Sequence, residues 1–232
     1  MLAAELVRLK VDVIVTGGPG VTRVIKEATS TIPIVMTQDA DPVATGIVAS
    51  LARPGGNITG LSRLSPELSG KRLELLKETV PKLSRVAVFG TSTNPGNALS
   101  LKEVDLAAGA LKVQLQYLDV LDPKDIETAF RTAVKGRAGA VLGEVSGPIG
   151  SPNRKEIAEL AVKHRLPVIY TLRSYVEAGG LMNYRASLLD LDRRAAVFVD
   201  KILKGRKPAD LPVEQPMRFE FFINLNAASR SA

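Results

Sequence analysis

Short apolar runs alternate with amphipathic segments of helical length along almost the whole chain. The apolar runs are continuous, which is typical of parallel strands buried on both faces. Helical segments between such strands predict an α/β fold with doubly wound parallel sheets. The expected strands are residues 11–16, 32–37, 57–61, 85–90, 113–119, 138–143, 167–171, 180–184 and 219–223. The expected helices include residues 66–79, 95–111, 123–135, 152–164 and 188–204.

A capping side chain followed by proline stands where five helices are expected to begin. Such a side chain accepts a free backbone N–H, and proline at the next position loses no hydrogen bond. Most of these pairs follow the carboxyl end of a strand, the edge where open parallel sheets bind ligands. Several helix N-termini could therefore face one crevice, although for any single pair we favour a helix cap and nothing more. The pairs are Asp41-Pro42, Ser65-Pro66, Asn94-Pro95, Asp122-Pro123 and Ser151-Pro152.

The order of the segments indicates two lobes. A new strand–helix series starts at Leu83, and three prolines between residues 208 and 216 predict an extended crossover. We expect a first lobe of residues 1–82 and 180–208, and a second of residues 83–179 and 209–232. Two α/β lobes joined by several crossings form a hinged ligand-binding cleft.

Composition argues against most other classes of protein. The net charge is +7, but the 31 basic residues are dispersed, so no nucleic-acid partner is expected. With no cysteine and one histidine, His164, we expect no metal site, no cofactor and no catalytic triad. No run reaches the ~20 apolar residues of a membrane span, and residues 1–10 are typical of an amphipathic helix rather than a signal peptide.

A glycine-rich turn after the first expected strand is the sharpest local motif. Gly18 and Gly20 match the first two glycines of a dinucleotide fingerprint, but Arg23 occupies the third position. Glycine there permits close packing of helix on strand, so the match is incomplete. We favour a turn that receives a carboxylate, with Gly18, Gly20 and Thr22 as donors. An NAD(P)-dependent α/β enzyme remains the alternative, which a cofactor-binding assay would decide.

Several longer blocks resemble ABC transporter substrate-binding proteins of the tryptophan/tyrosine type. They are ATSTIPIV at 28–35, DPV at 41–43, LARPGGNITGL at 51–61, ELSGKRLELLK at 67–77, VEAGGLM at 176–182 and KGRKPADLPVEQP at 204–216. The resemblance implies a type I periplasmic-binding fold and a non-enzymatic, monomeric solute-binding component of an ABC importer. It also implies a small-molecule ligand such as an amino acid or related carboxylate, an ABC permease as partner, and a periplasmic location.

Carried over position by position, the resemblance implies a set of ligand-binding residues. They are Gly18, Gly20, Thr22, Asp41, Asn94, Asn97, Glu144 and Tyr184. The chain departs from the family pattern at Thr91-Ser92, at Leu172, where an acidic residue is common, and at Arg185, which replaces a glycine. Fewer acidic groups and an added arginine predict recognition of an anionic group over an ammonium group.

The resemblance also implies that the first lobe lacks its initial βαβ portion, which would leave an exposed sheet edge. Our hypothesis is a misplaced start or a truncated chain; without an export signal the protein would be cytoplasmic. A cytosolic sensory or regulatory domain on the same fold is a further alternative, which an attached DNA-binding or signalling domain would favour.

Overall fold

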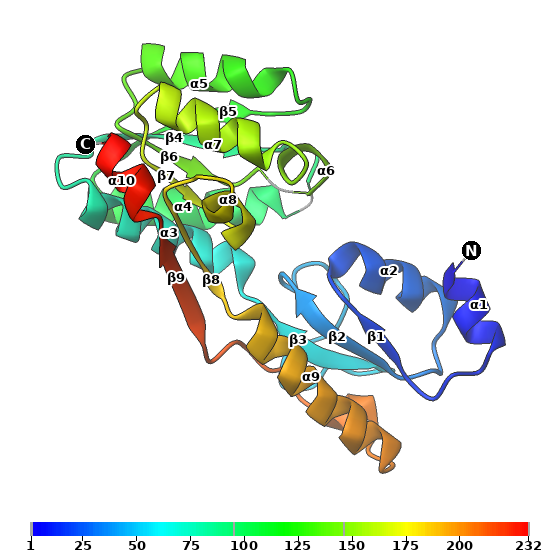
Figure 1. Cartoon of the computed structure of the whole chain (residues 1–232). Helices are drawn as coiled ribbons and strands as arrows, with labels where there is room; N and C mark the ends of the chain where they lie inside the picture. The colour runs from blue at the N-terminus through cyan, green and yellow to red at the C-terminus, as the bar shows by residue number, and fades with distance from the viewer. Residues whose placement is uncertain (1, 95, 146, 232) are drawn as a thin grey trace. The chain divides into compact units, whose positions relative to one another are not determined.

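The computed structural model describes residues 2–94, 96–145 and 147–231 (Figure 1). It divides into two compact units, between which the chain passes three times. The first unit comprises Met1–Ser65 and Ala186–Phe219, and the second comprises Pro66–Arg185 and Glu220–Ala232.

The first unit is a three-stranded parallel sheet with helices on both faces. The sheet order is β1-β2-β3, so β2 is central. The elements are α1 (Leu2–Arg8), β1 (Ile14–Thr16), α2 (Pro19–Ala28), β2 (Ile34–Asp39), β3 (Ile58–Ser62), α9 (Leu188–Leu203) and η1 (Pro208–Asp210).

Side-chain alternation along β2 decides which helix covers which face. Ile34 and Met36 pack in one apolar cluster with Ile25 of α2. Val35 and Thr37 point to the opposite face, because successive strand residues alternate. That face is covered by α9, which contacts both β2 and β3. Figure 1 shows α2 and α9 on opposite sides of this sheet.

Strand β3 approaches β2 so closely that one position must be glycine. Gly60 has φ +131°, and a Cβ built there would lie 2.1 Å from the carbonyl oxygen of Met36. The register between β2 and β3 shifts between Met36 and Asp39, just past this contact. The glycine therefore lets β3 pair with β2 at an irregularity of the sheet.

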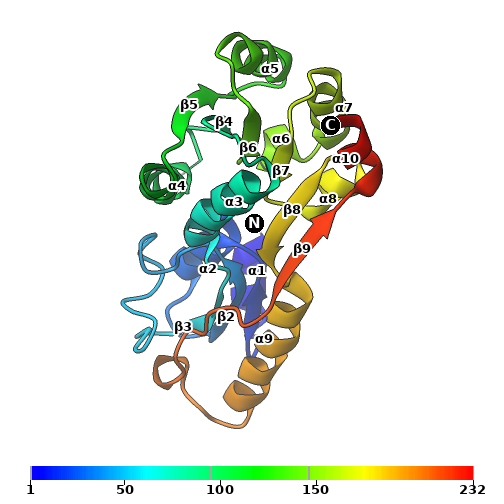
Figure 2. The same ribbon diagram turned by 90° about the vertical axis from the view of Figure 1, so that its left-hand side faces the viewer.

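The second unit is a six-stranded sheet in the order β5-β4-β6-β7-β8-β9, parallel from β5 to β8 (Figure 2). Its strands are β4 (Arg85–Gly90), β5 (Gln114–Asp119), β6 (Ala140–Gly143), β7 (Val168–Tyr170), β8 (Met182–Ala186) and β9 (Phe219–Ile223). Its helices are α3 (Ser65–Thr79), α4 (Asn97–Leu111), α5 (Asp125–Lys135), α6 (Gly147–Gly150), α7 (Arg154–Lys163), α8 (Arg173–Glu177) and α10 (Leu225–Ser231).

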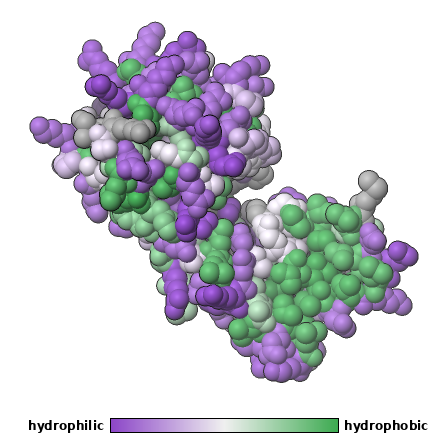
Figure 3. Space-filling view, in the orientation of Figure 1, coloured by the Kyte–Doolittle hydropathy of each residue, from purple (hydrophilic) through white to green (hydrophobic). Residues whose placement is uncertain are grey.

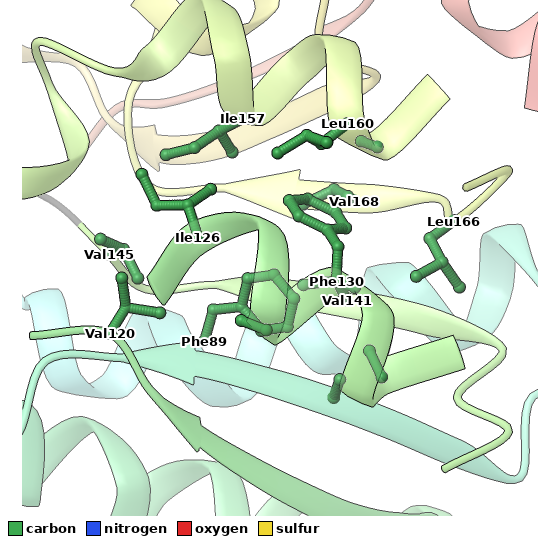
Figure 4. Packing of buried hydrophobic residues seen from close by; sticks show 14 of the residues in the cluster. Phe89, Val120, Ile126, Phe130, Val141, Val145, Ile157, Leu160, Leu166 and Val168 are labelled. Atoms are coloured by element: carbon green, nitrogen blue, oxygen red, sulfur yellow. The ribbon is translucent and has the colours of Figure 1, made fainter. Parts of the chain in front are cut away.

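Each face of this sheet has its own apolar cluster. One cluster joins β4, β6 and β7 to α5 and α7, and Figure 4 shows Phe89, Phe130 and Ile157 within it. The rings of Phe89 and Phe130 meet edge to face at 4.9 Å. The other cluster joins the sheet to α3 and α4 through residues such as Leu73 and Val104. Burial on both faces explains the continuous apolar strands of the sequence.

The predicted fold class is confirmed, since all nine expected strands form and the sheets are dominated by parallel pairs. The expectation of a helix after Asp41-Pro42 is wrong, because residues 42–48 form consecutive turns and bends. Helices α4, α5 and α7 begin two or three residues after their capping pairs. His164 terminates α7, as expected, and its ring stacks on Phe130 at 5.9 Å.

The division into units differs from the predicted lobe boundaries. The expected first lobe included α3 and β8, which lie in the second unit. Strand β8 belongs there because Met182 pairs in register with Ile169 of β7. The segment after η1 belongs to the first unit, because Val213 and Glu214 donate backbone hydrogen bonds to Leu51 and Gly60.

In the part of the chain that is described, no helix combines the length and apolarity needed to cross a bilayer.

Candidate functional site

Polar residues gather at the carboxyl ends of the strands in both units, as expected for a parallel α/β fold. In the first unit they follow β1 and β2, and in the second they follow β4, β5, β6 and β8.

The glycine-rich turn of the first unit joins β1 to α2. Gly18 is the residue before the helix and has φ +105°, a conformation that a side chain disfavours. A Cβ at Gly18 or Gly20 would meet no atom within 4 Å, so the space around both is open. Both glycines therefore remain candidates for close approach by a ligand.

Thr22, the third candidate of this turn, is fully buried and engaged inside the unit. Its hydroxyl donates to Asp39 Oδ2 at 2.7 Å and lies 2.8 Å from the hydroxyl of Thr16. Burial raises the pKa of Asp39, while the Thr22 hydrogen bond and the charge of Arg63 act to lower it. The other carboxylate oxygen, Oδ1, has no hydrogen-bond partner among the described residues. The structure thus joins two strand-end residues, Thr16 and Asp39, to Thr22 of α2 in a buried polar network.

Asp41 follows β2 and closes the turn that replaces the expected helix. Its Oδ1 accepts the backbone N–H groups of Val43 and Ala44 at 3.2 and 2.9 Å. These contacts are on the surface of the unit. Asp41 thus fulfils the capping role predicted for it, although a turn rather than a helix follows.

Asn94 and Asn97 lie together in the second unit, after β4. The backbone N–H of Asn97 donates to the Asn94 carbonyl at 2.9 Å. The Asn97 side chain donates to the Tyr117 hydroxyl at 3.1 Å, and that hydroxyl lies 3.3 Å from Asp119 Oδ1. The structure therefore connects Asn97 to the end of β5.

Asp119 is also held by Ser92, whose backbone N–H and hydroxyl both donate to its carboxylate. Partial burial acts to raise the pKa of Asp119, but the hydrogen bonds from Ser92 and Tyr117 outweigh it and leave the pKa lowered. This surface carboxylate was not among the predicted site residues.

Glu144, directly after β6, forms a buried ion pair with Arg72 of α3. The distance between Arg72 Nη1 and Glu144 Oε1 is 3.1 Å, and the side chains are 3% and 9% exposed. Arg72 Nε also donates to the carbonyl of Tyr184 at 2.9 Å. One arginine thereby links two predicted site residues, and the charge of Glu144 is neutralised within the unit.

Arg185 was expected to offer a positive charge to an anionic ligand. Its guanidinium instead pairs with Glu220 at 3.2 Å, with side chains 20% and 27% exposed. The neighbouring Tyr184 ring meets Phe221 edge to face at 6.2 Å. The prediction of an anionic ligand from Arg185 therefore loses its support.

Among residues 2–94, 96–145 and 147–231, no group of three or more His, Asp or Glu side chains is arranged to hold a metal ion.

Tyr170 and Tyr175 are core residues whose rings stack on each other, and burial raises the pKa of both hydroxyls. The Tyr175 hydroxyl donates to the Val145 carbonyl at 2.8 Å.

Sequence reasoning did not find Arg72, Asp39 or Asp119 as members of these sets. Arg72 lies inside a block used for the resemblance. Its spacing of four residues from Leu68 and from Leu76, both buried, places it on the apolar face of α3 and is the signal that could have indicated its burial. Asp39 ends an apolar strand, and a polar residue at that position is the one available hint.

The chain is similar to known proteins over nearly its whole length. Residues 1–231 match the family model described as ABC transporter substrate binding protein. A curated relative, the tyrosine-binding protein of Clostridioides difficile (strain R20291), is 25% identical over 224 residues. That alignment covers 96% of this chain and 64% of the relative, so the chain spans less than two thirds of its length.

Two solved structures share the fold over nearly the whole chain. A conserved domain protein from Vibrio cholerae is 28% identical with a TM-score of 0.86, covering 99% of this chain and 76% of that one. An ABC domain from Streptococcus pneumoniae, solved in complex with L-Trp, is 23% identical with a TM-score of 0.84, covering 98% of this chain and 78% of that one.

The matched family is one of binding proteins and not an enzyme class. Because its model matches all but the last residue, this chain belongs to the ABC transporter substrate-binding protein family.

Proposed function

We propose that the protein is the solute-binding component of an ABC importer and captures an amino acid or a related small carboxylate. The observation that carries the proposal is the family match over residues 1–231. The relatives support the ligand class, since one is named a tyrosine-binding protein and another was solved with L-Trp.

In this proposal the ligand is held between the two units, which close on it by hinge motion. The three passages of the chain between units, at residues 65–66, 185–186 and 219–220, serve as the hinge. A ligand that contacts both units only when they are closed stabilises the closed state by that difference in contact. The partner is the ABC permease of the same system, the location is periplasmic, and the binding protein acts as a monomer.

The proposed contacts come from both units. The open turn at Gly18 and Gly20 and the side chain of Asp41 act from the first unit. Asn94 and Asn97 act from the second, where Arg72 orders Glu144 and Tyr184. Because Glu144 is neutralised by Arg72, we assign it to positioning the site rather than to pairing with the ligand's charge.

A ligand screen tests the proposal. Purified protein is heated with each common amino acid, small carboxylates and NAD, and the midpoint of unfolding is recorded. A ligand at 100 times its dissociation constant adds about 2.7 kcal/mol of stability, a rise of several degrees for a chain of this size. A rise with an amino acid or carboxylate supports the proposal. A rise with NAD alone contradicts the proposal. So does an unfolding midpoint that rises with none of the small molecules tested.

Matched variants locate the contacts. Asn97→Ala and Asp41→Asn are expected to weaken binding of the ligand found in the screen by about tenfold each, the value of a lost hydrogen bond to a ligand. Asp105→Asn in the exposed middle of α4 and Asp12→Asn before β1 are the controls and should leave affinity unchanged. If Asn97→Ala and Asp41→Asn bind the ligand as tightly as the two control variants do, Asn97 and Asp41 do not contact the ligand.

A further inference from the structure

Four turns that lead from a helix into a strand of the second unit carry basic residues and no acidic ones. With the residues that flank them, these turns are residues 80–85, 111–113, 135–139 and 163–167, and they precede β4, β5, β6 and β7. Because these strands are parallel, their amino ends and the turns before them meet at one edge of the sheet. We call this edge the basic edge; its charged residues are Lys82, Arg85, Lys112, Lys135, Arg137, Lys163 and Arg165.

The basic edge is broad and open to solvent. The sheet order β5-β4-β6-β7 sets the four turns side by side, across three strand intervals that together span roughly 14 Å. Lys163 forms a surface ion pair with Glu127 at 3.4 Å, and the Arg85 guanidinium donates to Gln114. Figure 3 shows that hydrophilic side chains predominate over α5, the helix that leads into one of the turns. The side chains that are exposed and form no ion pair with a described residue are Lys82, Lys112, Lys135, Arg137 and Arg165.

Three of these residues adopt a backbone conformation that is typical of glycine. Lys112, Arg137 and Arg165 have φ values of +53°, +57° and +52°. Each ends a helix in the same way, since the next residue donates its backbone N–H to the carbonyl five positions earlier, at 3.0 Å in all three turns. Glycine is the common residue at this point of a helix end, because it enters the left-handed region without strain.

Basic side chains at these three positions lower the stability of the fold in two ways. The left-handed conformation is strained for a residue with a Cβ, and unpaired like charges along one edge repel each other. A favourable interaction with the helix dipole does not require them, because α5 and α7 already carry Lys135 and Lys163 in their last turns. Backbone strain persists where a side chain has a function, so the basic edge indicates a negatively charged partner.

The composition of the basic edge favours a lipid surface as that partner. Its turns contain no Phe, Tyr or Trp, and their apolar residues Leu83, Val113 and Leu166 are buried. Protein interfaces depend on aromatic and apolar anchors, and single-stranded nucleic acids stack on aromatic side chains. A bilayer with acidic headgroups needs neither, because basic side chains alone are attracted to a charged plane.

We propose that the basic edge binds acidic phospholipid headgroups at a membrane surface. The attraction is electrostatic, so the contact is peripheral and reversible. Asn97 and Glu144 follow the carboxyl ends of β4 and β6, at the opposite edge of the same sheet, and stay open to solvent. The protein therefore remains able to take up its ligand while it rests on the membrane. This contact goes beyond the proposed function and does not depend on the identity of the ligand.

Cosedimentation with vesicles tests the proposal. The full chain is mixed with vesicles of phosphatidylcholine alone, or of phosphatidylcholine and phosphatidylglycerol in equal amounts. We expect binding to the mixed vesicles only, at about 50 mM NaCl, and its loss at about 500 mM NaCl, where exposed charges are screened.

A triple variant separates lipid binding from folding. Lys112→Gly/Arg137→Gly/Arg165→Gly removes three charges and relieves three strained conformations. Its affinity for the mixed vesicles should fall at least about tenfold, while its unfolding midpoint should equal or exceed that of the wild type. Two matched variants should bind like the wild type. Lys112→Arg/Arg137→Lys/Arg165→Lys keeps the charges, and Lys102→Gln/Lys124→Gln/Lys155→Gln removes three exposed charges outside the basic edge.

Three outcomes would overturn the proposal. The first is an absence of binding to the mixed vesicles. The second is equal binding by the wild type and the triple glycine variant, or an equal loss of binding in the Lys102, Lys124 and Lys155 variant. The third is displacement of the protein from the vesicles by polyglutamate at an equal concentration of negative charge, which would assign the basic edge to an acidic protein.

Discussion

Arg72 and Glu144 lie 72 positions apart in sequence, and their charged atoms are 3.1 Å apart in a buried ion pair. The pair ties α3 to the carboxyl end of β6, and Arg72 reaches β8 through the Tyr184 carbonyl. Three elements that carry or support predicted site residues therefore depend on one guanidinium.

Removing either partner should be costly, because the other charge stays buried and uncompensated. We expect Arg72→Met or Glu144→Gln to lower the free energy of unfolding by about 3–5 kcal/mol, measured by urea denaturation. The double variant Arg72→Met/Glu144→Leu should recover most of this loss. Lys71→Met, which removes a surface pair with Glu74, is the control and should cost less than about 1 kcal/mol. Equal effects of Arg72→Met and Lys71→Met would show that the buried pair is not structural.

Asp39 should make stability depend on pH. Its pKa is raised in the folded state by burial, so the folded protein holds this proton more tightly than the unfolded chain. The contribution of Asp39 to the free energy of unfolding is therefore most favourable below its unfolded-state pKa of 3.8. It declines as the pH rises from 3.8 through the raised pKa of the folded state.

The comparison of wild type with Asp39→Asn isolates this effect, because asparagine cannot titrate. The stability of Asp39→Asn relative to wild type should grow with pH across that window, by at most about 1.4 kcal/mol per pH unit. Thr22→Val removes a hydrogen bond that lowers the Asp39 pKa, so it should extend the window to higher pH. Urea denaturation between about pH 3.5 and 7 measures both. A difference that stays constant with pH would exclude the raised pKa.

Gly60 should tolerate no side chain. Gly60→Ala places a Cβ against the Met36 carbonyl, which is backbone and cannot rotate away. We expect a loss of more than about 4 kcal/mol in the free energy of unfolding, an exceptional cost for one methyl group. Gly55→Ala is the matched control, since Gly55 also has a positive φ of +70° but open space around it. That change should cost about 1–2 kcal/mol; a similar value for Gly60→Ala would contradict the close approach of β3 to β2.

The elements that could be predicted from the sequence are those whose burial produces a recognisable apolar pattern. Strands such as 85–90 are apolar throughout because they are covered on both faces, so their type and position follow from pattern alone. The assignment of β8 to a unit does not follow, because both sheets offer equally apolar neighbours and only the pairing of Met182 with Ile169 decides it.

Charged residues were harder to place for a similar reason. Arg185 and Glu144 carry the right chemistry for a binding site, but their partners, Glu220 and Arg72, are 35 and 72 positions away. A single sequence contains no signal for such distant pairs. Local hydrogen bonds were easier to predict. Asp41 accepts hydrogen bonds from backbone N–H groups just after it in the chain, as its capping pattern predicts.

The most direct test of the account is to recover the bound molecule. The protein is dialysed to equilibrium against the amino acid or small carboxylate that raises its unfolding midpoint most, and the bound fraction is counted and identified by mass spectrometry. We predict one molecule per chain, saturable and recovered chemically unchanged after denaturation, as a binding protein requires. Recovery of an altered product, or saturable binding of NAD in its place, would contradict the assignment to solute capture.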